Sequence, residues 1–411
     1  MRILNYIIFI VFVVCALPTI PSCVDEQKLQ LVSEYTVQVT MPDEIKGIYV
    51  FANKTVTLRS QRMTYTSISD QSGLAKFNDI IPDIYDVYTS WDISGEELVN
   101  MSDSLVENRP ALISGITSSK KIFADSVITL KTLLFVKQSL LISKVYASGT
   151  RDFNNSAYTA DGYIEIFNNS DEIQYIDKIY LALVEGDSPI AFAAKDNPTD
   201  IHARQVFRFP GNGTEHPILP GKSIVACNSA IDHTANAPIT VNLQNADFEF
   251  KNSLSKPINN PNVTEVTLIH TSYVGLNYLN LQRGSVNGIC LFNTTENVGS
   301  YPLDYPPGKP SSLNKFLRIP AKFVFDGVEI LGYKSTGVDV NAKRLQSFID
   351  AGYKTISSTS GYSHESIERK VDTKKSTSTR VYLIDTNNSL NDMVTLTDPT
   401  QKKYDKTLLL Q

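Results

Sequence analysis

Apolar and polar residues alternate in short runs along most of this chain, and turn residues separate the runs. Residues 35–41, 54–58 and 63–68 alternate most clearly, and such alternation is typical of a strand with one buried face. Similar runs occupy residues 47–51, 70–77, 80–88, 124–130, 133–136, 140–146, 175–183, 219–226 and 247–250. The chain also contains 20 Tyr and 18 Phe, which favour strands. We therefore predict an all-β protein.

The first 23 residues break this pattern. Arg2 is followed by the apolar run Ile7–Val14, which is too short to span a bilayer, and Pro18 and Pro21 precede Ser22-Cys23. This order predicts a secretory signal, and its small residue before Cys23 resembles a bacterial lipoprotein cleavage site. The resemblance implies that residues 1–22 are removed and that Cys23 is acylated. The alternative is a plain signal cleaved near Ala16, which would leave Cys23 as an ordinary thiol.

Acidic residues follow directly after Cys23. Asp25 and Glu26 resemble the surface-export signal of Bacteroidota lipoproteins. That resemblance implies an outer-membrane protein that is lipid-anchored and exposed at the cell surface, with residues 23–35 as a tether. Multiple acyl chains can hold a protein at a membrane, because each buried methylene contributes about 0.8 kcal/mol.

Residues 36–137 form the first predicted β region. An Asp70-x-x-Gly73 turn leads into one strand and a Pro82-x-x-Tyr85 turn into the next. This order resembles the carboxypeptidase-regulatory-like, transthyretin-like β-sandwich, with residues 92–110 as an insertion. The resemblance implies a structural spacer or docking unit without catalytic residues.

Residues 138–411 form the second predicted region. The element Tyr163-Ile-Glu165-Ile-x-Asn168 and the turn Pro220-Gly221 resemble the lamin-tail type of immunoglobulin-like β-sandwich. The lamin-tail core is shorter than this region, so we expect insertions at residues 186–218, 229–245 and 296–316.

The end of the second region carries the only helix that we predict. It covers residues 341–351, has Leu345, Phe348 and Ile349 on one face, and ends before Gly352. A later Ser-x-x-Arg strand at residues 366–369 precedes an Asp/Asn-rich turn, as at the ends of lamin-tail-like domains.

The order of these modules resembles an uncharacterised family of Bacteroidota surface lipoproteins that contain a domain of unknown function. Members of that family often accompany TonB-dependent outer-membrane transporters. The resemblance implies that such a transporter, or another surface protein, is the partner.

The charge and the cysteine content bear on two questions, nucleic-acid binding and disulfide formation. The formal net charge is −5, and the chain shows no basic footprint, so we predict no nucleic-acid binding. Apart from Cys15 and Cys23, only Cys227 and Cys290 remain. They could pair in an oxidising compartment, or each could be a small buried core residue, since both lie in apolar runs.

The sequence shows no pattern of catalytic or metal-binding residues. The five His have no zinc-ligand spacing, and Ser188 and Ser223 lack the second glycine of a nucleophile elbow. Glu165 could be a general acid, but it reads more simply as a solvated strand residue. The run 385–392 has oxygen ligands at odd spacing, but Leu390 and Leu396 occupy the positions where an EF-hand needs Gly and Glu. We interpret it as a network of Asx turns, with a calcium site of another kind as the alternative.

We therefore expect no catalytic residues, no metal and no cofactor. The leading hypothesis is a non-enzymatic surface lipoprotein, a binding or accessory component of a TonB-dependent uptake system, with binding surfaces on its long loops. One alternative is a hydrolase that acts on glycans or peptides through carboxylates distant in sequence. The other is a structural or adhesive component of the envelope.

Overall fold

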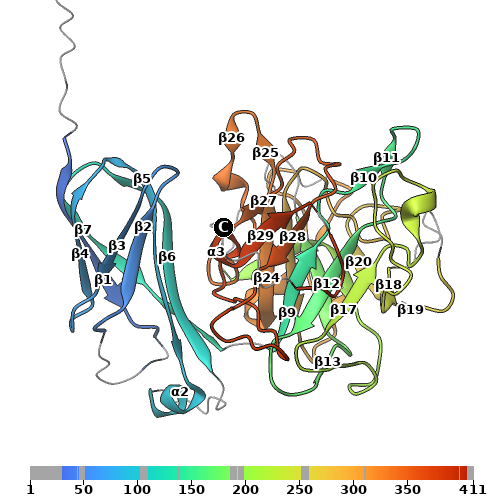
Figure 1. Cartoon of the computed structure of the whole chain (residues 1–411), viewed down its shortest axis with the longest axis horizontal. Helices are drawn as coiled ribbons and strands as arrows, with labels where there is room; N and C mark the ends of the chain where they lie inside the picture. Colours follow the sequence, from blue (N-terminus) through green and yellow to red (C-terminus); the bar gives the residue numbers. More distant parts are fainter. Residues whose placement is uncertain are drawn as a thin grey trace, which may run out of the picture.

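The computed structural model describes residues 30–43, 45, 51–101, 110–136, 139–185, 192, 199–250, 259–309, 312–397 and 399–404. The predicted signal at residues 1–22, Cys23, most of the tether and most of the predicted strand 47–51 lie outside these residues. Figure 1 shows two bodies, one coloured blue to teal and a larger one coloured green to red. Within the described residues, no helix has the length and apolar character needed to cross a membrane.

Strands β1–β8 pair only with one another and form the smaller body. They are β1 (Val32–Thr40), β2 (Thr55–Arg59), β3 (Thr64–Ile68), β4 (Leu74–Ile80), β5 (Asp83–Ile93), β6 (Ala111–Ile122), β7 (Ser126–Lys131) and β8 (Leu133–Val136). One sheet has the order β4-β1-β7 and the other β3-β2-β5-β6-β8. Tyr35, Val37 and Val39 from β1 pack against Val56 and Leu58 from β2 in the core between them. The alternation predicted for this region is therefore the alternation that buries one face of each sheet.

The turn before β4 forms as its sequence predicts. The Asp70 carboxylate accepts the backbone N–H groups of Ser72 (2.8 Å) and Leu74 (3.0 Å), while Gly73 has a φ of +85°. The expected insertion at residues 92–110 begins with the end of β5 and the short helix α2 (Gly95–Met101). Strand β6 was not predicted from the sequence, and it pairs with β5 along almost its whole length.

The larger body is built on two extensive sheets. The seven-stranded sheet has the order β19-β18-β17-β12-β9-β28-β29 and the other has the order β22-β23-β15-β14-β21-β24-β27, with β20 paired to β15. The strands of the first are β9 (Leu140–Val145), β12 (Tyr163–Asn168), β17 (Ser223–Cys227), β18 (Phe248–Glu249), β19 (Thr264–Glu265), β28 (Ser366–Arg369) and β29 (Met393–Leu396). Those of the second are β14 (Tyr180–Val184), β15 (Asp200–Arg208), β20 (Thr267–Thr271), β21 (Asn287–Phe292), β22 (Leu303–Asp304), β23 (Phe316–Pro320), β24 (Val324–Leu331) and β27 (Lys354–Thr355). The all-β prediction is confirmed.

Short elements connect these strands. They are the pairs β10 (Thr150–Arg151) with β11 (Ala157–Tyr158), β13 (Gln174–Tyr175) with β16 (Pro217–Ile218) and β25 (Tyr333–Lys334) with β26 (Gly337–Val338), the 3₁₀ turns η1 (His233–Ala235), η2 (Val298–Ser300), η3 (Ala321–Phe323) and η4 (Val340–Ala342), and the helix α3 (Ser389–Asp392).

Connecting segments cover the outer faces of both large sheets. Ala230, Val241 and Leu243 pack against Tyr163 and Cys227 on the outside of the seven-stranded sheet. On the outside of the other sheet, Val298, Leu345 and Ile349 pack on β14 and β21. As a result β9, β12, β14 and β21 are buried at every position.

The prediction that residues 186–218 form an insertion was partly wrong. Its later half contains β15, a nearly fully buried strand of the eight-stranded sheet. The sequence reads as polar there because β15 carries His202, Arg204 and Gln205. Each has a partner: His202 pairs with Asp304, Arg204 donates to the Val184 carbonyl, and Gln205 donates to the carbonyls of Leu276 and Tyr278.

The predicted helix at residues 341–351 was also wrong, since only η4 and turns occur there. The Glu329 carboxylate accepts the backbone N–H groups of Arg344 (3.0 Å) and Leu345 (2.6 Å), which replaces the helical hydrogen bonds. Leu345 and Ile349 are nevertheless buried, so the apolar pattern marked a packed segment rather than a helix.

Cys227 and Cys290 are both free and buried. Cys227 lies on the outer face of the seven-stranded sheet and Cys290 on the outer face of the other, so the main core separates them. In this structure the two thiols therefore do not pair. Burial raises the pKa of the Cys290 thiol well above its usual range, as expected for an inert core residue.

Candidate functional site

A ladder of three charged residues crosses the outer face of the seven-stranded sheet. Lys144 on β9 lies opposite Glu165 on β12 and opposite Glu368 on β28. We call these three residues the charged ladder. Glu165 is fully buried, so reading it as a solvated strand residue was wrong.

The C-terminal strap, residues 399–404, covers this ladder. The Lys144 ammonium donates to the carbonyls of Thr400 (2.7 Å) and Lys403 (2.6 Å) and lies 2.9 Å from the Glu368 carboxylate. An ammonium has three N–H donors, so these three acceptors use all of them. The ladder thereby holds the strap through its backbone.

Glu165 binds the strap from the other side. Its carboxylate accepts the Lys402 backbone N–H (2.9 Å) and the Tyr404 hydroxyl (2.6 Å), and also the Ser223 hydroxyl (2.6 Å). These hydrogen bonds hold the strap on the sheet, so the Glu165 carboxylate has a structural role. The hypothesis of an outward-pointing general acid therefore has no geometric support.

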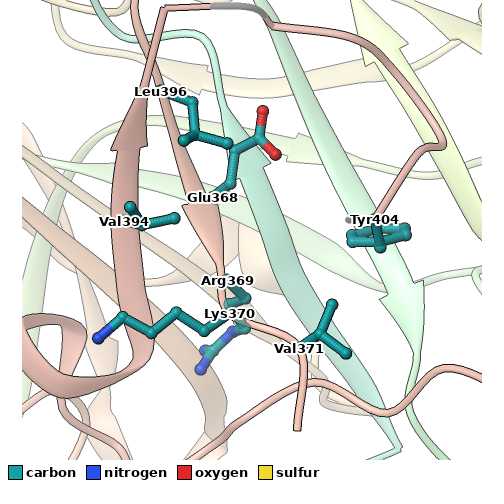
Figure 2. A pocket seen from close by; sticks show the side chains of 7 residues that line it. All are labelled: Glu368, Arg369, Lys370, Val371, Val394, Leu396 and Tyr404. Carbon is teal, nitrogen blue, oxygen red and sulfur yellow. The ribbon is translucent and has the colours of Figure 1, made fainter. Parts of the chain in front are cut away.

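Two hollows flank Tyr404. The smaller, shown in Figure 2, has a volume of about 10 Å³, which is room for about one water molecule. Its lining residues are Glu368, Arg369, Lys370, Val371, Val394, Leu396 and Tyr404. Burial raises the pKa of Glu368, and the nearby Lys144 charge opposes that effect.

The larger hollow has a volume of about 200 Å³. It is lined by Gly221, Lys222, Ser223, Val381, Lys402 and Tyr404. At its rim the Lys402 ammonium lies 2.7 Å from the Asp247 carboxylate. This hollow therefore combines positive charge with an apolar wall.

Arg369 is the centre of a second buried network. Its guanidinium contacts the carboxylates of Asp326 (2.6 Å), Asp385 (3.2 Å) and Asp392 (3.3 Å). Burial raises the pKa values of Asp326 and Asp392, and the Arg369 charge opposes that rise. Residues 385–392, the acidic run with oxygen ligands at odd spacing, thus bind the Arg369 guanidinium.

The predicted Asx turns in this run are present. Asn388 caps α3 by accepting the Leu390 N–H (3.1 Å), and Asp392 accepts the N–H groups of Thr386 (2.8 Å) and Asn388 (3.2 Å). The predicted strand at residues 366–369 is β28, and it supplies Arg369.

Histidines in the described part of the chain serve packing and hydrogen bonding. His202 bonds Asp304 (2.9 Å), His233 bonds the Tyr158 hydroxyl (2.8 Å), and His364 bonds the Tyr146 hydroxyl (2.9 Å). His270 bonds the Lys315 carbonyl (3.1 Å). Burial lowers the pKa values of His202, His233 and His270, which favours the neutral ring.

His216 belongs to the one group of described residues close enough to hold a metal ion, with Asp177 and Glu215. Sequence spacing misses the group because Asp177 lies far upstream. The Asp177 carboxylate already accepts the backbone N–H groups of Gly213 (2.9 Å), Glu215 (2.7 Å) and His216 (2.9 Å), and it bonds the His216 ring (2.8 Å). It therefore anchors the loop, and a cation would have to displace these bonds.

Two adjoining loops of the second body expose large apolar side chains. The Ser272 hydroxyl donates to the Lys315 carbonyl (2.6 Å), and the rings of Tyr273 and Phe316 are in contact. Val274 (101%) and Leu313 (97%) are almost completely exposed. We call residues 272–276 with 301–309 and 312–316 the loop pair, and much of it lies in the predicted insertion 296–316.

Comparison with known proteins agrees with the fold. Residues 219–400 match the family described as protein of unknown function (DUF4876). The crystal structure of a DUF4876 family protein from Bacteroides thetaiotaomicron is 22% identical, covers 91% of this chain and 98% of its own, and gives a TM-score of 0.58. This likeness concerns the fold alone. No curated protein matches the chain.

Two further structures give TM-scores of only 0.16, which is too low to indicate a shared fold. The Bacillus anthracis TIE protein is 10% identical over 48% of this chain and 28% of its own. A Bacteroides uniformis protein, provisionally described as carbohydrate binding, is 9% identical over 73% of this chain and 99% of its own. Residues 219–400 are thus similar to the DUF4876 family, and the all-β fold is like that of the Bacteroides thetaiotaomicron protein.

Proposed function

We propose that this protein is a surface-anchored, non-enzymatic lipoprotein that acts as a binding or accessory component of a TonB-dependent outer-membrane uptake system. Acylation of Cys23 anchors it in the outer membrane. Residues 36–137, as a carboxypeptidase-regulatory-like spacer, raise the lamin-tail-like region 138–411 above the membrane surface.

One contrast within the second body carries this proposal. The residues that could perform acid–base chemistry, such as Glu165 and Asp326, are buried and bonded into the architecture. The loop pair instead exposes Val274 and Leu313 to solvent. Exposed apolar side chains on loops of a rigid sandwich suit recognition of a protein partner.

The partner is tested by purification from native membranes. The tagged lipoprotein is extracted with detergent, and co-purifying proteins are identified by mass spectrometry. We expect a TonB-dependent transporter to co-purify, and to be lost with Val274→Asp or Leu313→Asp. The matched control is Val127→Asp, because Val127 is 68% exposed but lies on β7 of the first body.

A test for enzymatic activity could contradict the proposed binding role. The purified ectodomain is incubated with glycan and peptide libraries, and products are followed by mass spectrometry. Reproducible product formation would support the hydrolase hypothesis and overturn the binding role. A partner that co-purifies without being a transporter would support a structural or adhesive component instead.

A further inference from the structure

The larger hollow beside Tyr404 has the size of a small organic ligand. Its volume is about 200 Å³. Pockets for drug-sized ligands start at about 300 Å³. One sugar ring is in the size range that this hollow accepts.

Positive charge surrounds this hollow. Lys222 and Lys402 line it, and Arg380 packs directly against Gly221, where an added Cβ would lie 2.3 Å from the Arg380 guanidinium. Lys402 pairs with Asp247, and Arg380 lies 3.8 Å from the exposed Asp171. Lys222 is exposed to solvent, and its ammonium has no hydrogen-bond partner within the described part of the chain.

Residues that line the hollow are hydrogen-bonded to the buried Glu165 carboxylate. Ser223 and Tyr404, which line the hollow, both direct their hydroxyl protons to Glu165, and the Lys402 backbone N–H does the same. Val381 adds an apolar wall to this charged rim.

From these features we infer that the hollow binds one acidic sugar residue, a uronic acid unit of a glycan, with its carboxylate at Lys222. A uronic acid carboxylate is ionised at neutral pH and forms charge-assisted hydrogen bonds with an ammonium. Its ring has an apolar face for Val381 and hydroxyls for the Lys402–Asp247 pair. The inference rests on the proposed function and deepens it by naming the ligand class that is captured.

Binding is measured by calorimetry on the soluble ectodomain with glucuronic acid and galacturonic acid, with glucose as the uncharged comparison. We expect saturable binding of a uronic acid, weakening with salt, and little binding of glucose. Lys222→Gln should weaken uronic acid binding by about tenfold, because it removes the one charge-assisted contact without a competing partner. Lys121→Gln, an exposed lysine change on β6 of the first body, should leave binding unchanged.

Three results would overturn the inference. They are equal binding of glucose and the uronic acids, equal effects of Lys222→Gln and Lys121→Gln, and inorganic phosphate binding as tightly as the sugars. Each variant is first checked for an unchanged unfolding midpoint. If uronic acids fail to bind while a transporter still co-purifies, only the ligand inference fails; if they bind but no transporter co-purifies, the transporter assignment fails.

Discussion

The two bodies of this protein handle charge in opposite ways. In the first body, the ion pairs Lys76–Glu34 and Lys131–Asp43 lie in solvent, with side chains that are 51–81% exposed. In the second, the pairs Arg369–Asp326 and Arg344–Glu185 have side chains at most 2% exposed. Solvent screens the first kind of pair, whereas the second depends on complete pairing, because an unpaired buried charge is costly.

The difference follows from what covers the sheets. In the first body, strand β3 alternates between exposed and half-buried positions, so its outer face meets water. In the second, connecting segments and the C-terminal strap cover the outer faces, so polar residues on those faces become buried. Covering both faces of a sandwich thus turns ordinary outward-pointing charges into an internal network.

The largest predicted effect comes from Arg369→Met. This change leaves Asp326, Asp385 and Asp392 without their shared cation, and breaking a buried ion pair costs about 3–5 kcal/mol. Urea unfolding can assign the loss to one body, because the only Trp, Trp91, lies on β5 of the first. We expect the circular-dichroism transition of the second body to move to lower urea, while the Trp91 fluorescence transition moves little.

Lys131→Met is the matched control for that experiment, since it removes an exposed ion pair in the first body. We expect both transitions to stay within error of the wild type. A loss as large as that of Arg369→Met would contradict the contrast between the two bodies.

Lys144→Met should have the next largest effect, at about 3 kcal/mol. It removes the donor to the Thr400 and Lys403 carbonyls, while Glu368 keeps the Ser366 hydroxyl as a partner. Limited proteolysis should then cleave the strap faster than in the wild type. Lys402→Met is the control, because the Lys402 backbone N–H to Glu165 remains; equal cleavage of both variants would show that the ladder does not hold the strap.

The smallest predicted effect is a change in pH dependence. Burial raises the pKa of Glu329 to about 7 from its usual 4.5, with Lys343 opposing. The folded protein therefore holds this proton more tightly than the unfolded chain, so this contribution to stability is full below pH 4.5 and is lost as pH rises through 7.

Glu329→Gln keeps a neutral acceptor for the Arg344 and Leu345 N–H groups. Its free energy of unfolding, compared with that of the wild type, should therefore rise with pH by about 2.5 kcal/mol between pH 5 and 8. Unfolding in urea at several pH values measures this difference. Parallel stability profiles for the two proteins would contradict it.

The sequence predicted the strands of the first body better than those of the second. Alternation located most strands of the first body, and the Asp70 turn forms as predicted, because solvent keeps one face polar there. In the second body the outer cover breaks this rule: β15 carries buried His202 and Arg204, so its polar residues were read as an insertion.

The candidate site was predicted only in part. The Ser-x-x-Arg strand and its Asx-rich turn were recognised locally, but the contact of Arg369 with Asp326 joins strands distant in sequence. The helix prediction at residues 341–351 failed for a similar reason, since Glu329 takes the N–H groups that a helix would use. A local sequence pattern does not show which carboxylate, distant in sequence, will form hydrogen bonds with a given segment.

The C-terminal strap is an integral layer of the second body, closed over the charged ladder. Hydrogen exchange followed by mass spectrometry on the full chain tests it at the peptide that contains Lys402. We predict that the strap exchanges as slowly as strand β12, because the Lys402 N–H is bonded to buried Glu165. Exchange of the strap at the rate of an unfolded peptide, with β12 still protected, would contradict the account.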